Sequence, residues 1–86
     1  MAITTVASSA TSVQLLGTNT NRRNYVINNS ATTPLYISFG TSASTTSYSI
    51  SLQPGDSYES NLVVFTGQIN GIWSGSPTGN ANITEL

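Results

Sequence analysis

The sequence predicts an all-β fold, a small antiparallel β-sandwich of the jelly-roll kind with about seven to eight strands. Hydroxyl and amide residues carry the polarity of the chain: 14 Ser, 13 Thr and 9 Asn stand among 86 residues, and only 6% of residues are charged. Thr suits a pleated strand, whereas Ser, Asn and Gly favour turns and compete with helical hydrogen bonds. Short apolar alternations, separated by turn residues about every 8–12 positions, are typical of sandwiches and small barrels.

The first eleven residues differ from the rest of the chain. They are rich in Thr, Ser and Ala, and only Ile3 and Val6 offer apolar anchors. Such a segment packs weakly on its own domain. We therefore expect an extended N-terminal arm over residues 1–11 that becomes ordered against a neighbour, followed by a single β-sandwich domain over residues 12–86.

The first half of the predicted domain contains three strands, each marked by period-two alternation. Val13 and Leu15 share one face of the first strand, and the second strand covers Arg23–Asn28. Residues 28–34 indicate a turn. Leu35–Phe39 shows the clearest alternation of apolar and polar side chains and predicts a half-buried strand.

The second half begins with Tyr48–Leu52, where apolar residues alternate with Ser. Gln53–Asp56 indicates a tight turn, because Pro fixes φ at its second position and Gly permits a positive φ at its third. The remaining strands are expected within residues 58–65, Gln68–Trp73 and Asn80–Glu85.

The residue inventory argues against catalysis. The chain has no His, no Cys and no Lys, so a Ser or Thr nucleophile would lack a base. Asp56 and Glu59 flank a turn, where turn formation and solvent contact explain them better than glycoside hydrolysis does. A Ca²⁺ ion would need about six oxygen ligands, and the loops offer mainly neutral ones. We expect no enzyme activity, no catalytic residue, no metal and no cofactor.

Nucleic acids and membranes are also poor partners for this chain. Two cations cannot neutralise the several phosphates that nucleic-acid binding requires. The longest apolar run, Leu62–Phe65, is far shorter than the ~20 residues that span a bilayer. We expect neither kind of partner.

Arg22 and Arg23 are the only basic residues, and neighbours on a strand point to opposite faces. One interpretation pairs one of them with Glu59 or Glu85 and leaves the other in solvent. A second interpretation makes them interface contacts to an acidic partner.

Trp73 also has two interpretations. In a domain this small, a Trp of the core or of an interface supplies a large share of the buried surface. An exposed Trp would instead indicate stacking on a sugar. Gly71 interrupts the alternation before Trp73, which indicates a bulge or a close approach of the backbone at that point.

The sheet edges of this chain lack the usual protection. Monomeric sandwiches guard their edges with charges, Lys above all, with Pro or with bulges. Here Lys is missing and only five residues are charged. Because a small domain without disulfides also gains stability from association, we predict an oligomer whose edges are covered by other subunits or by a partner protein.

Six segments spread over residues 12–86 carry a family resemblance: SVQLL at 12–16, NTNRRNYVINNS at 19–30, LYISFG at 35–40, ISLQPGDSYE at 50–59, FTGQINGIW at 65–73 and GNANITE at 79–85. In combination they resemble small β-structured virion proteins of tailed bacteriophages. The resemblance implies a head decoration, or cement, protein on the capsid exterior that binds the major capsid protein and itself, with a trimer expected. Candidate partner-binding residues are Ile3, Val6, Arg22, Arg23 and Trp73.

A tail- or fibre-associated module that binds a carbohydrate or receptor is the alternative. Tyr36, Tyr48 or Trp73 would then stack on a sugar ring, which requires exposed rings. The exposure of these three side chains separates the two hypotheses.

Overall fold

The computed structural model describes residues 2–60 and 64–86 and confirms the all-β prediction. Its eight strands are β1 (Ala2–Ala7), β2 (Val13–Leu16), β3 (Tyr25–Asn29), β4 (Leu35–Phe39), β5 (Ile50–Leu52), β6 (Ser57–Glu59), β7 (Ile69–Trp73) and β8 (Asn80–Glu85). No helix in this part of the chain is long and apolar enough to cross a membrane.

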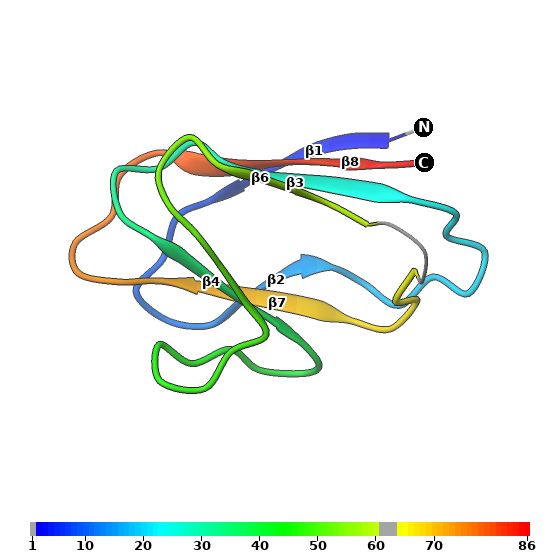
Figure 1. Ribbon diagram of the computed structural model, residues 1–86, viewed down its shortest axis with the longest axis horizontal. Coiled ribbons are helices and arrows are strands. Elements are labelled where there is room, and N and C mark those ends of the chain that lie inside the picture. The colour runs from blue at the N-terminus through cyan, green and yellow to red at the C-terminus, as the bar shows by residue number, and fades with distance from the viewer. Residues whose placement is uncertain (1, 61–63) are drawn as a thin grey trace.

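Two four-stranded sheets pack face to face, as Figure 1 shows. Sheet A has the strand order β1-β8-β3-β6, and sheet B has the order β2-β7-β4-β5. Every strand pair is antiparallel. The chain crosses from one sheet to the other at every connection except that from β4 to β5, and these two sheet orders form an eight-stranded jelly roll.

The core lies between the sheets and is built by the predicted alternation. Along β4, Leu35 and Ile37 are fully buried while Tyr36 and Ser38 point outward, and along β8 the buried residues are Ala81 and Ile83. Full burial of one such Leu or Ile side chain contributes about 1.5–3 kcal/mol. The buried apolar residues are Leu15, Leu16, Tyr25, Ile27, Ala31, Leu35, Ile37, Leu52, Ile69, Trp73, Ala81 and Ile83.

The close approach expected at Gly71 is present: the side chains of Leu15 and Leu35 pack directly against its backbone. A Cβ at Gly71 would lie 2.8 Å from Leu15 Cδ1 and 2.9 Å from Leu35 Cδ1. The bulge itself lies in the neighbouring strand, where the register of β2 shifts between Gln14 and Leu16. Because the bulge interrupts the alternation, both Leu15 and Leu16 are buried.

The turn predicted at Gln53–Asp56 is confirmed. The backbone N–H of Asp56 donates to the carbonyl oxygen of Gln53 at 2.9 Å, and Gly55 has a φ of 91°. Pro54 and Gly55 therefore occupy the second and third positions of a type II turn, as their φ preferences require. The turn connects β5 of sheet B to β6 of sheet A.

Apart from shifts of one or two residues at the ends of β3, β5 and β7, two expected segments differ from the structure. Residues 2–7 are extended, but they do not form an arm separate from the sandwich: they form β1 and pair with β8 from Ala2 opposite Glu85 to Ala7 opposite Asn80. Of the apolar run Leu62–Phe65, residues 62 and 63 lie outside the described residues, and Val64 and Phe65 are not part of a strand.

Candidate interaction surface

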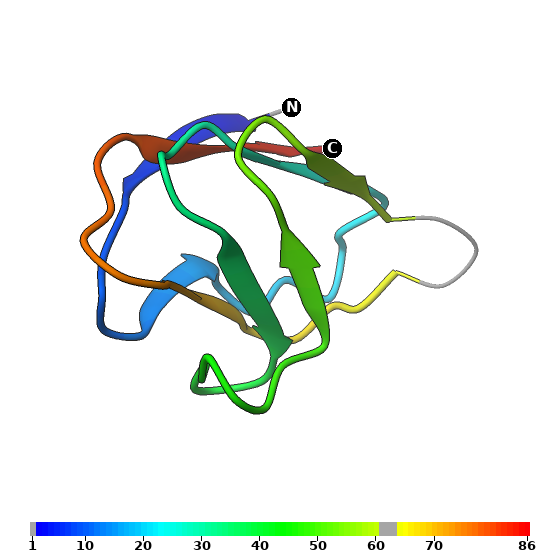
Figure 2. The ribbon, with the colours of Figure 1, turned by 60° about the vertical axis from the view of Figure 1, so that its left-hand side comes forward.

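The part of the chain that the structure describes has four edge strands, β1 and β6 in sheet A and β2 and β5 in sheet B (Figure 2). These edges differ in how they are protected. In sheet B, β2 is bulged and β5 has three residues. In sheet A, β6 has three residues and ends in Glu59, shortly after Asp56. β1 is the longest edge, with six residues, and its sequence AITTVA contains no charge and no Pro. Since short length, bulges, charges and Pro are what block strand addition, β1 is the least protected edge.

The hydrogen-bond phase shows which groups of β1 are free. Just beyond the strand, the Ser8 N–H donates to the Gly79 carbonyl oxygen at 3.0 Å, in the same register that places Val6 opposite Ala81. In an antiparallel ladder, every second residue exchanges backbone hydrogen bonds with the partner strand. The backbone N–H and C=O groups of the residues between them point away from that strand. The N–H and C=O groups of Ile3, Thr5 and Ala7 therefore point away from β8, toward the open edge.

The same three residues also place their side chains on the outer face of sheet A. Ile3 and Thr5 stand beside Thr84 and Asn82 of β8, on the side opposite the buried residues Ala81 and Ile83. Ile3 is 69% exposed, and Thr5 and Ala7 are also exposed. We call Ile3, Thr5 and Ala7, with their free backbone groups, the β1 edge surface.

Away from the edge, amides and hydroxyls cover the part of the outer face of sheet A around Asn28 and Asn82, while Glu59 lies on the same face at the far end of β6. Asn82 Nδ2 donates to Ser30 Oγ at 2.9 Å, and Asn28 Nδ2 donates to Ser57 Oγ at 2.9 Å. These side chains hold one another in place across β8, β3 and β6. Neutral polar groups are less costly to remove from water than charges, so this part of the face is suited to burial against another protein.

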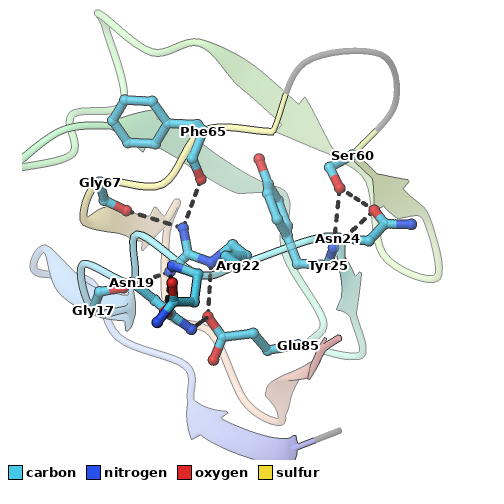
Figure 3. A network of polar contacts seen from close by, with 10 residues as sticks. Gly17, Asn19, Arg22, Asn24, Tyr25, Ser60, Phe65, Gly67 and Glu85 are labelled. Carbon is cyan, nitrogen blue, oxygen red and sulfur yellow. Dashed lines mark hydrogen bonds and ion pairs between the residues drawn. The ribbon is translucent and has the colours of Figure 1, made fainter.

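Arg22 is buried within its own chain, and Figure 3 shows the polar contacts that surround it. Its guanidinium donates to one carboxylate and three backbone carbonyl oxygens: Glu85 Oε2 at 2.7 Å, Phe65 O at 2.6 Å, Gly67 O at 3.2 Å and Gly17 O. Arg22 therefore ties β8 to two loops, those that follow β2 and precede β7. The structure thus favours the ion-pair interpretation with Glu85 and places Arg22 in the interior rather than on a partner-binding surface.

Glu85 of the ion pair and the neighbouring Tyr25 both have shifted pKa values. The hydrogen bond from Arg22 holds the pKa of Glu85 below its ordinary value of 4.5, against the opposing effect of burial, and a hydrogen bond from Asn19 at 3.3 Å adds to the lowering. The Tyr25 ring lies 5.6 Å from the guanidinium carbon. Burial, followed by the proximity of Tyr58, raises the pKa of Tyr25 to about 12.

Trp73 is a core residue, as one of its two interpretations expected. Its side chain is 1% exposed, and its Nε1 donates to Asn29 Oδ1 at 3.0 Å. It is therefore placed neither to stack on a sugar nor to contact a partner. The interior position is explained by its inward direction on β7, opposite Leu35 of β4.

Asn29, in a segment expected to form a turn, is a buried residue whose side chain connects the two sheets. It lies at the end of β3 and is fully buried. Its Nδ2 donates to the carbonyl oxygens of Leu52 at 2.9 Å and Thr33 at 3.0 Å, and its Oδ1 also accepts from the N–H of Ala31 at 3.1 Å. With the bond from Trp73, this one side chain links sheet A to β5 and β7 of sheet B.

The three other predicted partner-binding residues lie on or near β1. Ile3 and Val6 both belong to it, with Ile3 on the outer face and Val6 half-buried against the core. Arg23 is exposed, and its backbone N–H donates to the Leu86 carbonyl oxygen at 3.2 Å. Because β1 begins opposite Glu85, Arg23 lies at the same end of sheet A as the start of β1.

A pair of tyrosines lies on the opposite side of the sandwich. The ring centroids of Tyr36 and Tyr48 are 4.7 Å apart, with an interplanar angle of 48°. Tyr36 is on the outer face of sheet B between Ile72 and Ser51, and Tyr48 is 47% exposed. Of the three rings proposed for sugar stacking, these two remain accessible.

Within residues 2–60 and 64–86, no three His, Cys, Asp or Glu side chains lie close enough to hold a metal ion, and no cavity of ligand size is present. Comparisons with protein-family models, curated proteins and solved structures yield no match to this chain.

Proposed function

We propose that this protein is a structural virion component of a tailed phage that decorates and cements the capsid exterior by binding the major capsid protein and further copies of itself, without catalysis. The β1 edge surface is the observation that carries the proposal. It presents unpaired backbone donors and acceptors beside an exposed Ile, on the longest and least protected edge of the sandwich.

The composition supports the same proposal. A protein packed at high density against its own copies and against a shell buries much of its surface, and charges are costly to desolvate. This chain has five charged residues, and one of its two cations is already paired inside the fold. The outer face of sheet A holds a hydrogen-bonded layer of Asn and Ser side chains, which can exchange water for partner groups at low cost.

The test is binding to capsid shells of the encoding phage that lack this protein. Purified protein is incubated with the shells, pelleted with them and imaged by electron cryo-microscopy. The proposal expects density for the jelly roll at regular positions on the outer surface, with β1 at a protein contact. Density only at the neck, tail or fibres, or no binding to shells, would contradict it. The same images also test the trimer that the family resemblance implies.

A second candidate function is carbohydrate binding through Tyr36 and Tyr48, as in a tail- or fibre-associated receptor-binding module. The observation that favours it is the accessible ring pair on sheet B, since exposed aromatic rings present the apolar faces on which sugars stack. A glycan array, repeated with Tyr48→Ala, tests it. Binding that is lost in Tyr48→Ala supports this candidate, and the absence of any bound glycan removes it.

A further inference from the structure

We propose that β1 is a self-pairing strand. It pairs with β1 of a second copy of this chain, antiparallel, across a two-fold axis perpendicular to sheet A, so that the two A sheets become one continuous sheet. The inference rests on the proposed function, whose self-binding it specifies, and it predicts a two-fold dimer in place of the trimer that the resemblance implies. Its occupant is a second copy of this chain, and its contact surface is the β1 edge surface of each copy.

The hydrogen-bond phase fixes the register. Two antiparallel copies related by such an axis must pair residues of the same face and the same phase. The free groups belong to Ile3, Thr5 and Ala7, because the residues between them are bonded to β8. An axis through Thr5 places Thr5 opposite Thr5 and Ile3 opposite Ala7, so every free N–H and C=O of the three residues finds a partner. If the axis were shifted by one residue along β1, either Ile3 or Ala7 would have no partner among these three residues of the second copy.

The choice of a second copy follows from the other edges. A strand added to the whole of β1 must itself offer a free edge of similar length. Among the edges that the structure describes, β5 and β6 have three residues each and β2 is bulged, so within this chain only β1 matches β1. A contact in which the same patch serves both subunits closes as a two-fold dimer.

The side chains of β1 are compatible with facing their own copies. A charged residue at a two-fold axis would face an identical charge, whereas β1 carries none. The axis instead brings together two Thr5 side chains, a favourable cross-strand pair. Ile3, 69% exposed in the single copy, then lies beside Ala7 of the second copy on the outer face.

The test uses opposite charges at the axis. Sedimentation equilibrium is measured for the wild-type chain, for Thr5→Lys and Thr5→Asp separately, and for their equimolar mixture. Each single variant places like charges opposite each other and should raise the dimer dissociation constant about tenfold or more, whereas the mixture should recover dimers because Lys then faces Asp. Ser51→Lys is the matched control: it adds the same charge at an exposed site on sheet B and should leave the dissociation constant unchanged.

Four outcomes would overturn the inference: a wild-type chain that stays monomeric at high concentration, a trimer, single variants that dimerise as the wild type does, or a mixture that does not recover dimers. Circular dichroism and Trp73 fluorescence verify that each variant is folded. Shell binding separates the two proposals. A monomer that binds capsid shells refutes self-pairing alone, and a dimer that binds no shells refutes the capsid proposal alone.

Discussion

Replacing Asn29 with Ala should strongly destabilise the sandwich. Asn29 is fully buried and makes four hydrogen bonds through its side chain, two as donor and two as acceptor. Removing the amide leaves Trp73 Nε1 and the Ala31 N–H without their acceptor, in a region from which water is excluded. Two backbone carbonyl oxygens lose a donor at the same time.

The expected magnitude follows from the two orphaned donors. A buried donor without a partner costs about 1–3 kcal/mol, so two of them, with the small cavity left by the amide, lower the free energy of unfolding by about 3–5 kcal/mol. A chain of 86 residues has a total stability of about 4–13 kcal/mol. At the lower end of this range the variant should unfold at room temperature, and at the upper end it should lose roughly a quarter to two fifths of the wild-type stability.

Urea titration at fixed protein concentration, followed by Trp73 fluorescence and circular dichroism, measures the change. Asn28→Ala is the matched control, because Asn28 is the neighbouring residue on the same strand and its hydrogen bonds lie at the exposed outer face. The control should lose less than about 1 kcal/mol. Equal losses in the two variants would refute the role assigned to the Asn29 connector.

Three further predictions concern acid stability, packing and the environment of the single Trp. Because Arg22 lowers the pKa of Glu85, the stability that this pair contributes is present above about pH 4.5 and is lost as the pH falls through the lowered pKa. Urea titrations from about pH 7 to pH 3 should show this loss of stability. The loss should be smaller in Glu85→Gln, which has no carboxylate to protonate at this position. Gly71→Ala should destabilise the fold by about 1–3 kcal/mol, since its Cβ would lie within 2.9 Å of two leucine Cδ1 atoms. Gly40→Ala is the control: a Cβ there has no atom within 4 Å, so its stability should stay within about 0.5 kcal/mol of the wild type. Thermal denaturation measures both variants. Trp73 emission should be blue-shifted and resistant to acrylamide, and red-shifted, easily quenched emission would show that the ring is exposed.

Local patterns predicted the strands that have one face in the core. Leu35–Phe39 and Asn80–Glu85 alternate because inward positions must be apolar to fill the space between the sheets, and both form strands with those bounds. The Pro54-Gly55 turn was equally readable, because its residues have intrinsic φ preferences. These features depend on residues that are close together in the sequence, so local patterns are enough to predict them.

Features that depend on contacts between distant parts of the chain could not be predicted from the local sequence. The segment AITTVA alternates poorly, since an edge strand buries little of either face, and its partner β8 lies at the other end of the chain. Asn29 lies in an Asn-Asn-Ser run that is typical of turns, and nothing local distinguishes an amide that will be buried. For Arg22, the two candidate carboxylates were named, but the choice of Glu85 depends on the pairing of β3 with β8.

Amide hydrogen exchange along β1, measured by NMR at low and high protein concentration, tests most directly whether this strand is the docking edge. If β1 is the docking edge, the amides of Ile3, Thr5 and Ala7 should exchange rapidly in dilute solution and become protected as the concentration rises, while those of Thr4 and Val6, which face β8, should change little. Association that leaves the three outward amides unprotected would show that the subunits dock elsewhere.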